Sequence, residues 1–225
     1  MAEEIYKLST TCQIKGLSDI YLFYLGYKND GVFVEFGAYD GENCSNTSGL
    51  ADIGWTGLYV EPVTDYYKKC KDRHKKNLGV KVVNCAVGDK NGSAEIHLGG
   101  PLSTIRDDVL DKFKSMKWSK NEHGGKKETV NMMLLEKILI GAGIPKNFDV
   151  LSVDVEGYEW LALRDFDIRE WGPKIVIIEL HDNNENYSEE WPECNKLIEY
   201  FDENGYRVVW KDFGNTVYAR KEAVL

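Results

Sequence analysis

The chain has 225 residues, of which 43% are hydrophobic, and its 28 basic and 37 acidic residues give a net charge of −9. This composition excludes a disordered or fibrous chain, and the length suits one domain whose core needs no disulfide or structural metal. We therefore expect a single domain over residues 1–225. The acidic balance argues against a nucleic-acid partner, because phosphates favour a basic surface.

Cysteine usage and hydropathy indicate the compartment. The five cysteines form no metal-binding spacing and their number is odd, so we expect reduced thiols in a cytoplasmic protein. Residues 1–30 lack the pattern of a secretory signal, and no run reaches about 18 apolar residues, so no membrane span is expected. The oligomeric state stays open.

Strand and helix patterns alternate along most of the chain. Short apolar runs predict strands buried on both faces over residues 32–36, 56–62, 80–87, 148–155 and 174–180. Helical patterns cover residues 63–70, 132–140 and 190–204, and residues 1–30 are expected to form a helical segment that covers the sheet. This order predicts a doubly wound, mostly parallel α/β fold of the Rossmann-like type.

The end of the chain departs from this alternation. Residues 206–210 and 216–220 are strand patterns separated by a five-residue loop that contains Gly214 and Asn215. They predict a β-hairpin, so that one antiparallel strand near the C-terminus closes the sheet. The turn at Asn91-Gly92 predicts a further hairpin strand over residues 93–98.

Residues 100–128 form a long segment with a basic character. Six lysines lie between Lys112 and Lys127 against one acid, Glu122. A solvated surface insertion explains this segment, and so does a mobile lid or an acceptor-binding loop. The basic charge favours an anionic or phosphate-bearing acceptor.

The strongest motif, Glu35-Phe36-Gly37-Ala38-Tyr39-Asp40-Gly41, directly follows the first strand. Its glycines allow a tight turn and a close approach to a ligand, and doubly wound sheets bind ligands at the carboxyl ends of their strands. The spacing is not the G-x-G-x-x-G of dinucleotide sites, and the two flanking acids would repel a pyrophosphate. The motif therefore disfavours NAD and favours a positively charged ligand, such as an amino group or a sulfonium.

Two further strand ends suit a nucleoside. Glu61 ends the second strand, where an acid can accept hydrogen bonds from both ribose hydroxyls; a surface acid before a helix is the alternative. Residues 84–89 end the third strand, and their small side chains suit the edge of an adenine ring unless they form a plain turn.

The fourth and fifth strands deliver acids and a histidine. Asp154, Glu156 and Glu159 follow the fourth strand. Repulsion between their negative charges would destabilise the folded protein, so their clustering indicates a bound cation or a role in proton transfer. Asp154 and Glu156 share one side of an extended segment, whereas Glu159 can serve to cap the next helix. His181, beside Asp182, is a candidate general base or metal ligand.

Together these motifs resemble the FkbM-type methyltransferases, which are class I enzymes dependent on S-adenosylmethionine. The resemblance covers residues 32–180 and rests on residues 33–41, 60–62, 86–89 and 151–159, of which the last is the most specific. It implies a seven-stranded sheet with one antiparallel strand. The resemblance implies that Glu35, Gly37, Tyr39, Asp40 and Gly41 surround the methionine of the cofactor and that Glu61 binds its ribose. It also implies that Cys85 and Ala86 lie at the adenine and Asp154 near the methyl group and the acceptor. Ala38 and Pro62 are further expected cofactor-binding residues.

The resemblance also implies O-methylation of a hydroxyl of a sugar or a polyketide, and a sugar is the expected acceptor. Asp154, Glu156 and His181 are the expected catalytic residues, with Asp154 or His181 as the base. Alternatively, Asp154, Glu156, His181 and Asp182 hold a divalent metal, Mg²⁺ or Ca²⁺. Trp118 is the aromatic residue expected to stack on the sugar ring.

Three alternatives stay open. They are a methyltransferase for a small non-sugar hydroxyl or an amide, a non-catalytic nucleotide-binding module, and an NAD oxidoreductase. The acids at four strand ends argue against a non-catalytic module, and the glycine spacing argues against an NAD oxidoreductase. The identity of the acceptor, the methylated position and membership of a larger enzyme stay open.

Overall fold

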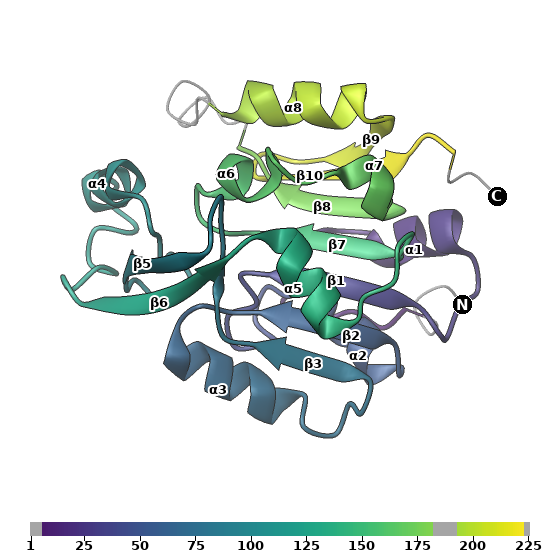
Figure 1. Cartoon of the computed structure of the whole chain (residues 1–225), viewed down its shortest axis with the longest axis horizontal. Coiled ribbons are helices and arrows are strands. Elements are labelled where there is room, and N and C mark those ends of the chain that lie inside the picture. Colours follow the sequence, from purple (N-terminus) through teal and green to yellow (C-terminus); the bar gives the residue numbers. More distant parts are fainter. Residues whose placement is uncertain (1–5, 182–192, 223–225) are drawn as a thin grey trace.

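The computed structural model describes residues 6–181 and 193–222, and its centre is a seven-stranded sheet (Figure 1). The strand order is β3-β2-β1-β7-β8-β10-β9. These strands are β1 (Val32–Phe36), β2 (Thr56–Val60), β3 (Val80–Val83), β7 (Val150–Val153), β8 (Ile175–Glu179), β9 (Tyr206–Lys211) and β10 (Asn215–Arg220).

The pairing confirms the predicted fold class. β1 pairs in parallel with β2 and β7, β2 with β3, and β7 with β8. β10 runs antiparallel to both β8 and β9. Because the other strands run in one direction, their carboxyl ends meet at one edge of the sheet.

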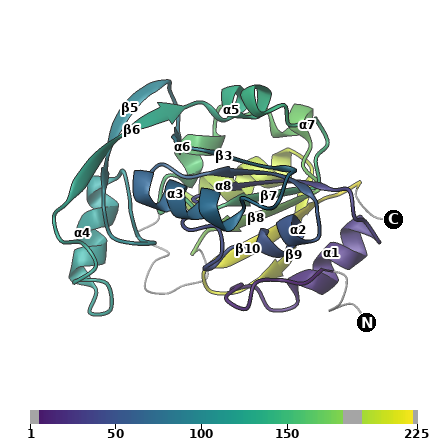
Figure 2. The same ribbon diagram turned by 90° about the horizontal axis from the view of Figure 1, so that it is seen from below.

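Helices cover both faces of this sheet, as Figure 2 shows. Successive residues of a strand point to opposite faces, so Phe33 joins one apolar core and Val34 the other. The first core is covered by α1 (Leu17–Leu25), α2 (Ser48–Asp52) and α3 (Thr64–Arg73). The second is covered by α5 (Leu135–Ala142), α6 (Glu159–Leu163), α7 (Ile168–Trp171) and α8 (Cys194–Glu203).

A second sheet corrects two strand predictions. It has the order β4-β6-β5 and consists of β4 (Ala86–Val87), β5 (Gly92–His97) and β6 (Lys127–Met133). The strand predicted over residues 80–87 is interrupted, because Asn84 turns away and donates hydrogen bonds to the carbonyl oxygens of Glu61 (2.9 Å) and Pro62 (2.8 Å). β5 does form, but it pairs with β6, which lies between β4 and β5.

The first residues of the helix predicted over residues 132–140 belong to β6 instead. Val130 and Met132 are buried at alternate positions, as in a strand with one covered face, and α5 begins only at Leu135. The helical spacing of the apolar residues therefore corresponds to a helix only from Leu135 onward.

The segment 100–128 is not one long loop. The backbone of Thr104 pairs with that of His97, α4 (Asp107–Ser115) follows, and β6 begins at Lys127. α4 forms because its apolar stripe, with Val109 and Phe113, is buried against the rest of the protein. We call residues 98–126 the insertion; Figure 1 shows its helix beyond the carboxyl ends of the parallel strands.

The predicted helical N-terminal segment is correct only for α1. Residues 6–16 form turns and bends, and Ser9 and Thr11 donate hydrogen bonds to Glu42 in the loop after β1. At the other end, α8 begins at Cys194, and residues 190–192 of the predicted helix lie outside the described residues. Among the described helices, none is long and apolar enough to cross a membrane.

Candidate active site

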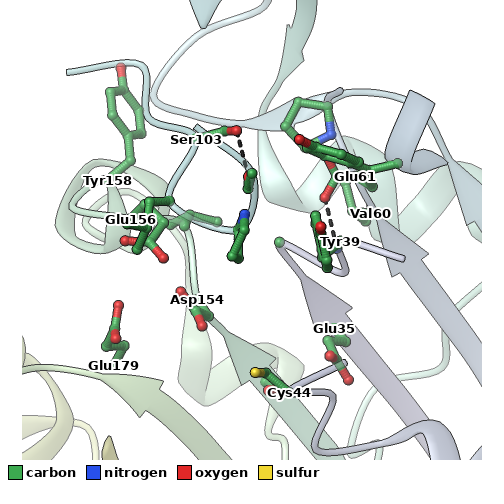
Figure 3. A pocket seen from close by; sticks show the side chains of 18 of the residues that line it. Glu35, Tyr39, Cys44, Val60, Glu61, Ser103, Asp154, Glu156, Tyr158 and Glu179 are labelled. Atoms are coloured by element: carbon green, nitrogen blue, oxygen red, sulfur yellow. Dashed lines mark hydrogen bonds between the residues drawn. The ribbon is translucent and has the colours of Figure 1, made fainter. Parts of the chain in front are cut away.

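A pocket of about 330 Å³ opens at the carboxyl ends of β1, β2, β7 and β8 (Figure 3). Its walls come from the loops after these strands, from β4 and β5, and from the insertion. Parallel strands deliver residues that are distant in the chain to the same edge, which is why one pocket collects motifs from across the sequence.

Glu35 is held inside the protein at the end of β1. It is 5% exposed and accepts hydrogen bonds from the hydroxyls of Ser45 (3.0 Å) and Thr47. Burial raises the pKa of Glu35 to about 7 despite these bonds. Gly37 follows at φ +70°, and a Cβ atom there would lie 1.6 Å from the carbonyl oxygen of Asp154. Only glycine fits this turn.

Glu61 directly follows β2 and lies beside that turn. It is 4% exposed, and its two carboxylate oxygens accept the backbone N–H groups of Tyr39 (2.9 Å) and Val63 (2.8 Å). Burial raises the pKa of Glu61 to about 8. Each oxygen retains a second lone pair, so the oriented carboxylate can still accept hydrogen bonds from a ligand.

Small and apolar residues line the next part of the wall. Cys85, Ala86 and Val87 are buried and border the pocket together with Ile96 of β5. The hydrogen bonds of Asn84 fix the start of this segment against the end of β2. The result is an apolar surface beside Glu61 that suits a flat ring.

Three carboxylates face one another elsewhere in the pocket (Figure 3). Asp154, Glu156 and Glu179 each offer an oxygen within 4.8 Å of the others. Burial, followed by the charge of Glu179, raises the pKa values of Asp154 and Glu156 well above their usual range. Within the described residues, Asp154 Oδ1 and Glu179 Oε2 are buried without a hydrogen-bond partner. A proton, a cation or a ligand donor is needed to offset this arrangement.

Glu159 lies outside this group and braces the loop after β7. Its Oε1 accepts the backbone N–H groups of Val155 (3.1 Å) and Gly157 (3.2 Å), and burial raises its pKa to about 7. The braced loop holds Glu156 at φ +51°, a left-handed conformation that non-glycine residues rarely adopt.

His181 follows β8 and contacts the carboxylates through Glu179. Its Nε2 lies 3.0 Å from Glu179 Oε1, and its backbone has φ +52°. Burial lowers the pKa of His181, but the hydrogen bond and the charge of Glu179 outweigh burial and raise the pKa above its ordinary value. Glu179 therefore stabilises a proton that the imidazole of His181 takes up.

Comparison with known proteins agrees with this geometry. The profile of the methyltransferase FkbM domain matches residues 35–208, which is more than half of the chain. The chain belongs to the FkbM methyltransferase family.

Among the solved structures that share the fold of this FkbM methyltransferase are two with a TM-score of 0.50. A provisionally assigned O-methyltransferase from Klebsiella pneumoniae is 12% identical, with a TM-score of 0.50 over 97% of this chain and 86% of that chain. An O-methyltransferase from Bacillus cereus in complex with S-adenosylhomocysteine is 13% identical, with a TM-score of 0.50 over 95% and 82%. No functionally curated protein matches.

The structure brings most predicted site residues of the FkbM methyltransferase together. The pocket is lined by Glu35, Gly37, Tyr39, Glu61, Pro62, Cys85, Ala86, Asp154, Glu156 and His181. Ala38, Asp40 and Gly41 do not line it: Ala38 packs in the core, Asp40 accepts backbone hydrogen bonds in its own turn, and Gly41 lies against His74. Asp182 lies outside the described residues.

Glu179 was not among the predicted site residues. A signal existed, because an acid at the end of the strand that pairs with β7 must lie near Asp154. Phe213 was also not predicted. It lies in the β9–β10 turn and reaches the pocket only through the tertiary fold, which a local sequence pattern does not indicate.

Proposed function

We propose that this FkbM methyltransferase transfers a methyl group from S-adenosylmethionine to a hydroxyl group of a sugar. The observation that supports this proposal is that one pocket combines a surface suited to a nucleoside with a separate group of carboxylates. A carboxylate with spare lone pairs, Glu61, stands beside an apolar wall, and the carboxylates around Asp154 line another part of the same pocket. The fold is also that of the Bacillus cereus enzyme with its S-adenosylhomocysteine.

The residues present fit a sulfonium nucleoside. Glu61 offers acceptors for the ribose hydroxyls, and Cys85 and Ala86 leave room for the adenine. We place the methionine portion along Glu35 and the Gly37 turn, because a buried carboxylate stabilises a nearby positive charge. The negative charges of Glu35 and Glu61 would repel the pyrophosphate of NAD, which disfavours the oxidoreductase alternative.

S-adenosylmethionine supplies an activated methyl group when it is bound. The protein therefore has to align the acceptor hydroxyl and take up its proton. We propose Asp154 or His181 as the base, with Glu156 beside them as a hydrogen-bond acceptor for the substrate. Asp154 is suited to this role because its Oδ1 is buried without a partner, and a raised pKa strengthens a carboxylate as a base.

A divalent cation is a second proposal for the same carboxylates. Asp154, Glu156 and Glu179 present oxygen ligands of the kind that Mg²⁺ and Ca²⁺ prefer. A cation there would offset most of the negative charge of the three carboxylates and make a bound hydroxyl more acidic. This set shares Asp154 and Glu156 with the sequence-based one and adds Glu179, which His181 contacts. Asp182 lies outside the described residues, so its part in a metal site stays a prediction.

A sugar acceptor is favoured because it brings several hydrogen-bond donors. The two buried carboxylate oxygens without a partner can accept hydrogen bonds from ligand hydroxyls, and a sugar offers several hydroxyls in a small volume. A small non-sugar hydroxyl compound is the alternative acceptor.

Three further proposals concern the protein as a whole. We propose that residues 1–225 form one domain. We also propose that the protein acts in the reducing cytoplasm, since all five cysteines are free. Because the net charge is −9, we propose that its partners do not include nucleic acid.

Transfer of a labelled methyl group tests the reaction. The protein is incubated with S-adenosyl-[methyl-¹³C]methionine and methyl glycosides of common hexoses, deoxyhexoses and hexuronic acids, with catechol as a non-sugar acceptor. We expect a ¹³C signal from an O-methyl group on a glycoside. Label on catechol alone would replace the sugar by a non-sugar acceptor, and label on none of these compounds would contradict the proposed acceptor classes.

A further inference from the structure

Two exposed aromatic rings border the pocket. Trp118 of the insertion is 62% exposed and Phe213 of the β9–β10 turn is 69% exposed, and both line the pocket. Apolar rings are unfavourably hydrated, so a ligand that covers them gains free energy. Phe23 on α1 is also 62% exposed but does not line the pocket, which makes it a matched control.

The ring of Phe213 is carried by a fixed turn. Asp212 Oδ1 accepts the backbone N–H of Gly214 at 2.9 Å, and the carbonyl oxygen of Gly214 accepts the N–H of His181 at 3.2 Å. The turn is therefore tied to the end of β8, next to the histidine. Phe213 is exposed although hydrogen bonds hold the backbone on its C-terminal side.

The ring of Trp118 is carried by a folded part of the insertion. Ser119 is fully buried and donates a hydrogen bond to the carbonyl oxygen of Phe113 at 2.7 Å, and the Phe113 ring stacks on His123. The insertion and the β9–β10 turn therefore each present one aromatic ring to the same pocket.

We propose that Trp118 and Phe213 form the acceptor subsite and contact the C–H faces of a pyranose ring. A pyranose carries hydroxyls around its rim and apolar C–H groups on its faces. Its faces can cover the two rings while its rim hydroxyls donate to Asp154 and Glu179, whose buried oxygens lack partners. A phenol covers the rings equally well but brings fewer donors. This inference rests on the proposed function, because it concerns the same pocket.

Saturation-transfer NMR tests the subsite without requiring turnover. The probes are methyl α-D-glucopyranoside, methyl α-D-mannopyranoside, methyl α-L-rhamnopyranoside and catechol, each with the protein in the presence of S-adenosylhomocysteine. We expect saturation of ring C–H protons in at least one glycoside. The signal should fall at least about fivefold in Trp118→Ala and in Phe213→Ala, persist in Trp118→Phe and be unchanged in Phe23→Ala. The exposed positions should leave the melting temperature unchanged.

Two results would overturn the inference. One is saturation of catechol with none of the glycosides, and the other is a glycoside signal that neither alanine substitution reduces. A parallel calorimetric titration with S-adenosylhomocysteine keeps the proposed function separate. Binding of this nucleoside without any glycoside contact would refute only the subsite, whereas absence of nucleoside binding would refute the proposed function itself.

Discussion

The carbonyl oxygen of Asp154 occupies the space where a side chain at Gly37 would begin, at 1.6 Å from the position of its Cβ. The turn after β1 and the loop after β7 are therefore in direct backbone contact. In the proposed reaction, the first surrounds the methionine of the cofactor and the second faces the acceptor. Any substitution that separates them should disturb both halves of the pocket.

Gly37→Ala tests this contact. The added methyl group has to displace the backbone at Asp154, so we expect at least about tenfold weaker binding of S-adenosylhomocysteine and a lower melting temperature. Gly54→Ala is the control, because Gly54 also has a positive φ, +98°, but no atom lies within 4 Å of its added Cβ. Equal effects of the two substitutions, measured by calorimetry and thermal unfolding, would show that backbone strain alone is responsible.

Glu61→Gln tests the ribose site. The amide nitrogen of glutamine would face a backbone N–H at Tyr39 or Val63, and one acceptor for the ligand would be lost. We expect about 10- to 100-fold weaker binding of S-adenosylhomocysteine, as for the loss of a buried hydrogen bond of about 1–3 kcal/mol. Glu95→Gln, at an exposed ion pair with Lys127, should leave the affinity unchanged. Unchanged affinity in Glu61→Gln would remove Glu61 from the ribose.

The parallel sheet was predictable because its strands are buried on both faces and read as continuous apolar runs. The boundaries near β4 and β6 were not, because they depend on tertiary contacts. Asn84 ends β3 by binding carbonyl groups of the neighbouring strand end, and Met132 enters β6 because that strand inserts between β4 and β5. Local apolar spacing records neither event.

The raised pKa of Glu61 makes stability depend on pH. Its pKa of about 8 in the folded protein lies above the ordinary value of about 4.3, so the folded state holds a proton that the unfolded state releases. This stabilisation is fully present below pH 4 and is lost as the pH rises towards 8. The free energy of unfolding of the wild type, relative to Glu61→Gln, should therefore decrease from pH 5 to pH 8 in denaturant titrations. A difference that stays constant or increases with pH would contradict the assigned pKa.

Substitutions among the acids and the histidine test the chemistry. Asp154→Asn and His181→Ala should each lower the methyl-transfer rate, by about 100-fold or more for the group that is the base, while affinity for S-adenosylhomocysteine changes less than about threefold. Glu179→Gln should lower the rate and also lower the pKa of His181, because it removes the charge that favours the imidazolium. That pKa is measured by NMR titration of the imidazole. Wild-type rates in both Asp154→Asn and His181→Ala would exclude the two proposed bases.

The site residues that could be predicted from the sequence are those in motifs at the ends of strands. Glu35, Glu61 and Asp154 reach one pocket because parallel strands end at one edge. Asp40 resembled them in sequence, but its carboxylate is used by the backbone of its own turn. Phe213 carries no motif at all, and it reaches the pocket only because β10 inserts between β8 and β9.

The central claim is that this pocket binds the methyl-donor nucleoside. Calorimetric titration of the protein with S-adenosylhomocysteine, with NAD as the control and with and without a chelator, tests it most directly. We predict micromolar binding of S-adenosylhomocysteine and no binding of NAD. Loss of methyl transfer on chelation, restored by Mg²⁺ or Ca²⁺, would show that the reaction needs a divalent cation and would support the cation proposal. Absence of S-adenosylhomocysteine binding by the folded protein would contradict the account.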